Sequence, residues 1–71
     1  MSNVILELHR EIARVRILLP KFDPAVRQLA AGTIRYAEAS LAQNQYEAIR
    51  EAIEDLQEFR LPPVIVEGES Q

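Results

Sequence analysis

The chain has 71 residues, 48% of them hydrophobic and 27% charged, with two glycines and four prolines, a composition typical of a folded domain. This length holds one small domain, and because the chain has no cysteine, neither disulfides nor thiolate metal sites stabilise it. The net charge of −3 at pH 7 argues against sequence-independent binding to DNA, RNA or an anionic membrane.

The first predicted helix covers about residues 3–19. Ser2 or Asn3 can accept a hydrogen bond from a free backbone N–H of its first turn, and Pro20 ends it. Apolar residues recur at alternating steps of three and four, the pattern of a helix that packs along one side. They are Ile5, Leu8, Ile12, Val15 and Leu19.

The first helix is also apolar on its opposite side. Leu6, Ala13 and Ile17 project there, interrupted by Arg10, and Leu18 fills a flank. A helix that lacks a polar face is usually buried on two sides. We therefore expect the second apolar stripe to be covered by another part of the chain or by another molecule.

Two interpretations of that cover are open. Either Phe22 or the C-terminal run Val64, Ile65 and Val66 covers the stripe, or the stripe is an interface with a protein partner or a second copy. We favour the interface, because a core this small gains stability from oligomerisation. Its predicted residues on the first helix are Leu6, Ala13, Ile17 and Leu18.

The second predicted helix covers about residues 24–42. Asp23 is expected at its N-cap and Pro24 at its first position, where the missing N–H has no cost. Gly32 in its interior costs roughly 1 kcal/mol relative to alanine. This cost indicates a neighbour packed near Gly32, which we add to the predicted interface.

The third predicted helix covers about residues 45–59, begins with the cap pair Asn44 and Glu47, and is followed by Pro62 and Pro63. Its acidic residues line the side opposite Ile49 and Leu56; they are Glu47, Glu51, Glu54, Asp55 and Glu58. Such a stripe is usually a solvated face, and the functional alternative is an acidic surface that docks a basic partner. A carboxylate-bridged metal site would need core-facing Glu-x-x-His pairs, which the sequence lacks.

Residues 61–71 form a predicted extended, proline-containing C-terminal segment. Val64, Ile65 and Val66 are the only β-favouring run of the chain. We expect this run to fold back across the apolar side of the first helix or to add to the sheet edge of another protein.

Catalytic and cofactor motifs are not found in the sequence. The single histidine, His9, has no local motif that brings a serine, Thr33 or an aspartate to it, so we assign it no catalytic role. We expect no metal, cofactor or small-molecule ligand. The first apolar stretch is broken at Glu7 and none approaches the length of a membrane span, so the expected location is the cytoplasm.

These elements predict the all-α class: a small antiparallel three-helix bundle over residues 1–60, followed by the extended segment 61–71. Charge is distributed unevenly, with a net +3 in residues 1–35 and −6 in residues 36–71. Such polarity can favour packing within the bundle or antiparallel pairing of two chains.

Residues 30–60 resemble the C-terminal helical lid segment of Hsp70 chaperones. The resemblance lies in Ala37-Glu38-Ala39-Ser40-Leu41, a short polar turn, Ala48-Ile49 and Leu56. It covers less than half of the chain, and nothing corresponds to the nucleotide-binding or β-sandwich domains of that family. It implies a stand-alone, lid-like helical bundle without ATPase or peptide-cleft function.

The function predicted from the sequence is a non-enzymatic protein-interaction module, a small regulator or adaptor subunit that forms a homodimer through its first helix. Two alternatives stay open. One is an acidic decoy or inhibitor, for example phage-encoded, whose third helix occupies the basic nucleic-acid-binding groove of a partner. The other is the lid-like bundle implied by the resemblance.

Overall fold

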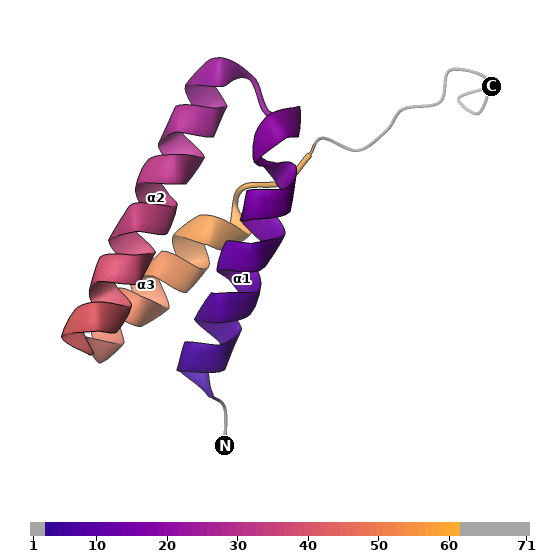
Figure 1. Cartoon of the computed structure of the whole chain (residues 1–71). Coiled ribbons are helices and arrows are strands. Elements are labelled where there is room, and N and C mark those ends of the chain that lie inside the picture. Colours follow the sequence, from indigo (N-terminus) through magenta and orange to yellow (C-terminus); the bar gives the residue numbers. More distant parts are fainter. Residues whose placement is uncertain (1–2, 62–71) are drawn as a thin grey trace.

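A computed structural model describes residues 3–61. It contains α1 (Val4–Leu18), a 3-10 turn (Leu19–Lys21), α2 (Pro24–Gln43) and α3 (Tyr46–Gln57), and this part of the chain has no strand. In Figure 1, α1 and α2 run in opposite directions, and α3 runs back obliquely behind them. α3 packs against both other helices. The predicted all-α class with three helices is confirmed.

The helix boundaries agree with the predicted ranges to within two residues. Asn3 is the N-cap of α1, and its Oδ1 accepts a hydrogen bond of 3.0 Å from the backbone N–H of Leu6, as predicted. Pro24 occupies the start of α2, also as predicted. The chain beyond Leu18 tightens into the 3-10 turn, which carries Pro20.

One cap prediction is confirmed in position only, and another is wrong. Asp23 occupies the N-cap of α2 as predicted, but its carboxylate makes no capping hydrogen bond; its backbone carbonyl accepts from the N–H of Arg27 at 2.7 Å. Asn44 does not cap α3. It ends α2 in the left-handed conformation, with φ 56°, and α3 begins after Gln45, whose side chain makes no capping bond. The short connection needs a left-handed residue to end α2, and asparagine adopts that conformation more readily than most residues.

The core lies where the three helices meet. Its buried apolar residues are Leu8, Ile12, Val15, Phe22, Ala30, Ile34, Ala37, Ile49, Ala52, Ile53 and Leu56. Phe22 is 7% exposed and its ring lies 6.2 Å from that of Phe59, so it belongs to the core and does not cover the second stripe of α1, whereas the alternative cover, Val64 to Val66, lies outside the described residues. Buried Ser40 donates a hydrogen bond of 2.9 Å to the carbonyl of Tyr36, which satisfies its hydroxyl.

Candidate functional site

The first candidate surface is the outward side of α1, formed by Leu6, Arg10, Ala13 and Ile17, which we call the α1 face. Steps of four, three and four residues align these side chains on one side of the helix. All four residues are exposed, with Ile17 at 71% and Leu6 at 48%, while Leu8, Ile12 and Val15 on the opposite side are buried in the core. Within residues 3–61 the α1 face is thus an unpartnered apolar stripe with one positive charge in it. Ile5, predicted in the packed stripe, is 44% exposed, because it lies in the first turn of the helix.

Two residues of the predicted interface lie elsewhere. Leu18 is half-buried and packs against the core cluster, so it does not belong to the α1 face. Gly32 lies on α2, where an added Cβ would meet nothing closer than Nη2 of Arg35, at 4.0 Å. Within the part of the chain that the structure describes, no neighbour packs closely enough to require glycine at this position.

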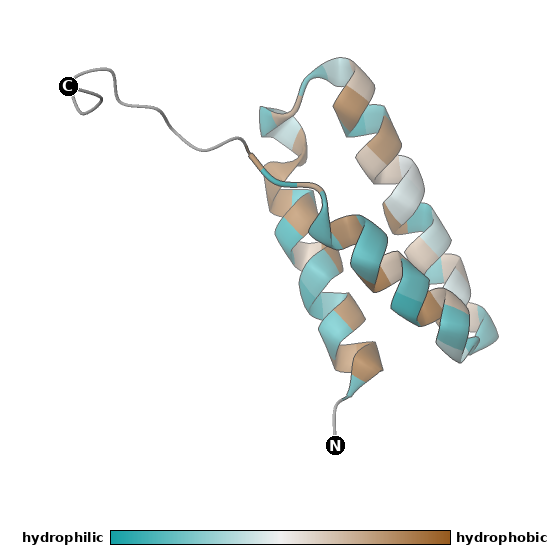
Figure 2. Cartoon of the chain, turned by 180° about the vertical axis from the view of Figure 1, so that it is seen from behind, coloured by the Kyte–Doolittle hydropathy of each residue, from teal (hydrophilic) through white to brown (hydrophobic). Residues whose placement is uncertain are grey.

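The second candidate surface is the outward side of α3, formed by Glu47, Glu51, Glu54, Asp55 and Glu58, which we call the acidic face. All five are exposed, and the buried side of the helix carries the core residues Ile49, Ile53 and Leu56, as the periodicity predicted. Figure 2 shows hydrophilic residues along the outward side of α3. None of the five carboxylates forms an ion pair within residues 3–61.

One acidic-face residue contacts α2. The hydroxyl of Tyr36 donates a hydrogen bond of 3.2 Å to Oε1 of Glu51. This bond to a carboxylate stabilises the protonated phenol and raises the pKa of Tyr36 above its usual value of 10.0. Glu51 is therefore partly fixed in position, unlike a freely rotating surface glutamate.

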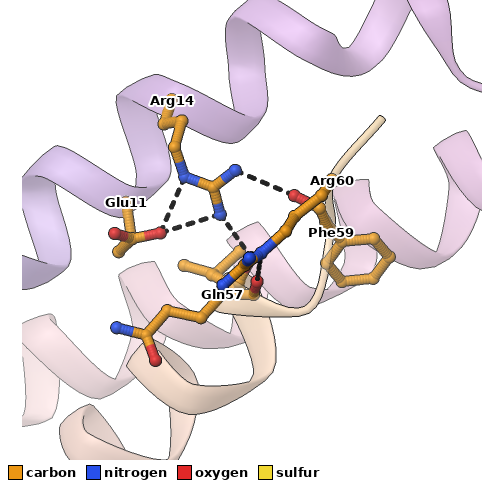
Figure 3. A network of polar contacts seen from close by, with 6 residues as sticks. Glu11, Arg14, Gln57, Phe59 and Arg60 are labelled. Carbon is orange, nitrogen blue, oxygen red and sulfur yellow. Dashed lines mark hydrogen bonds and ion pairs between the residues drawn. The ribbon is translucent and has the colours of Figure 1, made fainter. Parts of the chain in front are cut away.

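Arg14 forms a polar network that fixes the end of α3 against α1 (Figure 3). Its guanidinium donates to the carbonyls of Leu56, at 2.8 Å, and of Phe59, at 2.9 Å, while Nε donates to Oε1 of Glu11 at 2.9 Å. The carbonyl of Leu56 also accepts from the backbone N–H of Phe59 at 3.0 Å, so Arg14 adds a second donor there. A positive charge at the carbonyl end of a helix is favourable. Arg14 thus holds the chain beside α1 where it leaves the bundle.

Two more of the N-terminal arginines also serve the fold. Arg27 donates to the carbonyls of Leu19, at 3.0 Å, and Phe22, at 2.9 Å, and so closes the turn between α1 and α2. Arg16 forms an ion pair with Glu38 of α2. Arg10, in contrast, makes no side-chain hydrogen bond or ion pair with another residue between 3 and 61, so its charge is available on the α1 face.

Among residues 3–61, no contact joins the groups considered for catalysis. His9 is exposed, and the hydroxyls of Thr33 and Ser40 donate to carbonyls four residues earlier in their own helix. Among the residues that the structure describes, no three His, Asp or Glu side chains are grouped to hold a metal ion. No helix in that same part of the chain has the length and apolar character to cross a membrane.

Comparisons with protein-family models, curated proteins and solved structures gave no match to this chain. The resemblance of residues 30–60 to the Hsp70 lid segment stays a prediction. The predicted recognition run of Val64, Ile65 and Val66 lies outside the described residues.

Proposed function

We propose that this chain is a non-enzymatic, cytoplasmic protein-interaction module, a small regulator or adaptor that self-associates through the α1 face. The observation that supports it is the 71% exposure of Ile17 and 48% exposure of Leu6 on one side of a helix whose opposite side supplies the core residues Leu8, Ile12 and Val15. Apolar stripes of this kind, bordered by polar residues, are typical of protein-protein contacts.

The size of the domain supports the same proposal. Chains near 70 residues bury about 60% of the surface that the unfolded chain exposes, and this core holds eleven buried apolar residues. Burying two further aliphatic side chains per copy on association adds stability that the monomer lacks.

Sedimentation at low micromolar concentration tests the proposal. We expect the wild type to self-associate, and Leu6→Glu and Ile17→Glu to yield folded monomers, because a buried glutamate opposes association. Leu29→Glu is the matched control, since Leu29 is also exposed, at 65%, but lies on α2. A wild type that stays monomeric would contradict the proposal, as would equal self-association in all variants.

The acidic face supports a second candidate function, a decoy that occupies a basic groove of a nucleic-acid-binding partner. Five exposed carboxylates, without ion-pair partners between residues 3 and 61, provide a dense negative surface. Such binding weakens steeply as salt rises.

Charge reversal tests this second candidate. Glu54→Lys with Glu47→Lys is expected to abolish binding to an immobilised basic nucleic-acid-binding protein while circular dichroism stays unchanged. Glu7→Lys, an exposed glutamate on α1, is the control for net charge. Binding that is insensitive to salt, or equally reduced by the control, would reject the decoy.

A further inference from the structure

We propose that in the self-associated form the segment Val64–Glu69 of each copy lies on the α1 face of the other copy. This inference rests on the proposed self-association and specifies its contact. The α1 face comes from the structure, and the segment, which lies beyond the described residues, enters through its sequence.

Charge complementarity selects this occupant. The α1 face carries Arg10 between Leu6 and Ile17 and contains no carboxylate. Two glutamates lie beside it: Glu11 is bound to Arg14, and exposed Glu7 forms no ion pair with Arg10. Two α1 faces packed directly on each other would place two Arg10 side chains in one apolar contact, which like-charge repulsion opposes. The segment instead supplies three apolar β-branched residues followed by Glu67 and Glu69.

The spacing of the two partners also matches. Successive side chains of an extended chain point to opposite sides, so Ile65 and Glu67 share one side and lie about 7 Å apart at ~3.3 Å per residue. Ala13 and Arg10 are three residues apart on α1, about 4.5 Å at the helical rise of ~1.5 Å per residue, and the long arginine and glutamate side chains span the difference. An extended segment therefore places Ile65 on Ala13 when Glu67 reaches Arg10.

The direction in which the chain leaves the bundle after α3 favours docking of the segment on the other copy over docking on its own α1. The hydrogen bond from Arg14 to the carbonyl of Phe59 holds the exit beside α1, and from Phe59 to Leu61 the chain runs toward the C-terminal end of that helix (Figure 1). Arg10 lies one turn in the opposite direction. Docking on its own helix requires a reversal at Pro62 and Pro63, whose fixed φ and effect on the preceding residue favour an extended chain. Exchange around a two-fold axis requires no reversal.

Disulfide trapping tests the placement, because the chain contains no cysteine. The double variant Ala13→Cys with Ile65→Cys is oxidised under mild conditions and separated on a non-reducing denaturing gel, and the linked peptides are identified by mass spectrometry. We expect a covalent dimer joined between positions 13 and 65. Ala39→Cys with Ile65→Cys is the control, since Ala39 is an exposed alanine on α2.

Two outcomes of the trapping overturn the inference. A disulfide-linked monomer would show that the segment lies on its own α1. A yield of the 13–65 link no higher than that of the control would show that the segment does not dock on the α1 face at all.

Sedimentation separates failure of this inference from failure of the proposed function. We expect a chain that ends at Leu61 to keep its helix content but to self-associate at least about tenfold more weakly. Arg10→Glu should also weaken association, and adding Glu67→Arg to it should restore part of the loss. A truncated chain that associates as tightly as the full chain overturns the exchange alone, whereas a full chain that never associates overturns the proposed function itself.

Discussion

Replacing Arg14 by alanine removes the two hydrogen bonds that join α1 to the carbonyls of Leu56 and Phe59. The side chain of Arg14 is 35% exposed, so water replaces part of each bond, and we assign about 1 kcal/mol to each, the lower part of the usual range. Loss of a positive charge at the end of α3 adds about 0.5 kcal/mol. Together these losses lower the free energy of unfolding by about 2–3 kcal/mol, or the Tm by about 10–20 °C.

Urea unfolding followed by far-ultraviolet circular dichroism measures this loss, with all variants at one protein concentration because self-association contributes to stability. Arg35→Ala is the matched control: Arg35 is exposed on α2 and makes no side-chain hydrogen bond with another residue of the described chain. We expect it to change the free energy of unfolding by less than about 0.5 kcal/mol. Arg14→Lys should recover only the part of the stability that comes from a positive charge at the end of α3, because lysine cannot reproduce the forked geometry of the guanidinium.

The same substitution has a local readout. Amide hydrogen exchange in the last turn of α3 should accelerate in Arg14→Ala more than exchange at Leu8 or Ala37, which are fully buried in α1 and α2. Equal stability of Arg14→Ala and Arg35→Ala, within about 0.5 kcal/mol, would refute the assignment of a stabilising role to this network.

Three further changes follow from single contacts. Glu51→Gln should lower the pKa of Tyr36, measured by the ultraviolet absorbance of the phenolate, and an unchanged titration would disprove the contact. Because the pKa of Tyr36 in the folded state is raised above its unfolded value of 10.0, its bond to Glu51 stabilises the fold below pH 10. This stabilisation is lost as the pH rises through the folded pKa. Gly32→Ala should raise the free energy of unfolding by about 0.5–1 kcal/mol, because the Cβ of the new alanine meets only the far end of the Arg35 side chain. A measured loss of stability would reveal a contact outside the described residues. Asn44→Ala should lower the free energy of unfolding by about 1 kcal/mol, whereas Asn44→Gly should not lower it, because φ at this position is 56° and glycine adopts that conformation freely. Equal effects of the two substitutions would argue against the left-handed cap.

The helices were predictable because their signals are local. The cap at Asn3, the proline at position 24 and the apolar periodicity each act within one or two turns. Asn44 shows where local reasoning fails. The same asparagine suits the N-cap of one helix and the left-handed end of another, and only the length of the connection in three dimensions decides between them.

The candidate surfaces were predictable to the same extent. Periodicity alone separates the α1 face and the acidic face from the core, but Leu18 lies at the edge of its stripe, where packing of the 3-10 turn decides burial. Arg14 was missed because its carbonyl partners lie 42 and 45 residues away in the sequence. Its only local signal is the spacing of three residues from Glu11, which is common on helix surfaces.

The two arginines that bind backbone carbonyls differ greatly in the length of chain that each encloses. Arg27 reaches carbonyls only five and eight residues away, so its bonds form with little loss of chain entropy and can assist an early α1–α2 hairpin. Arg14 encloses more than forty residues, and its bonds require both helix connections to be already in place. We therefore expect the hydrogen bonds of Arg14 to form after those of Arg27 during folding and to break before them during unfolding.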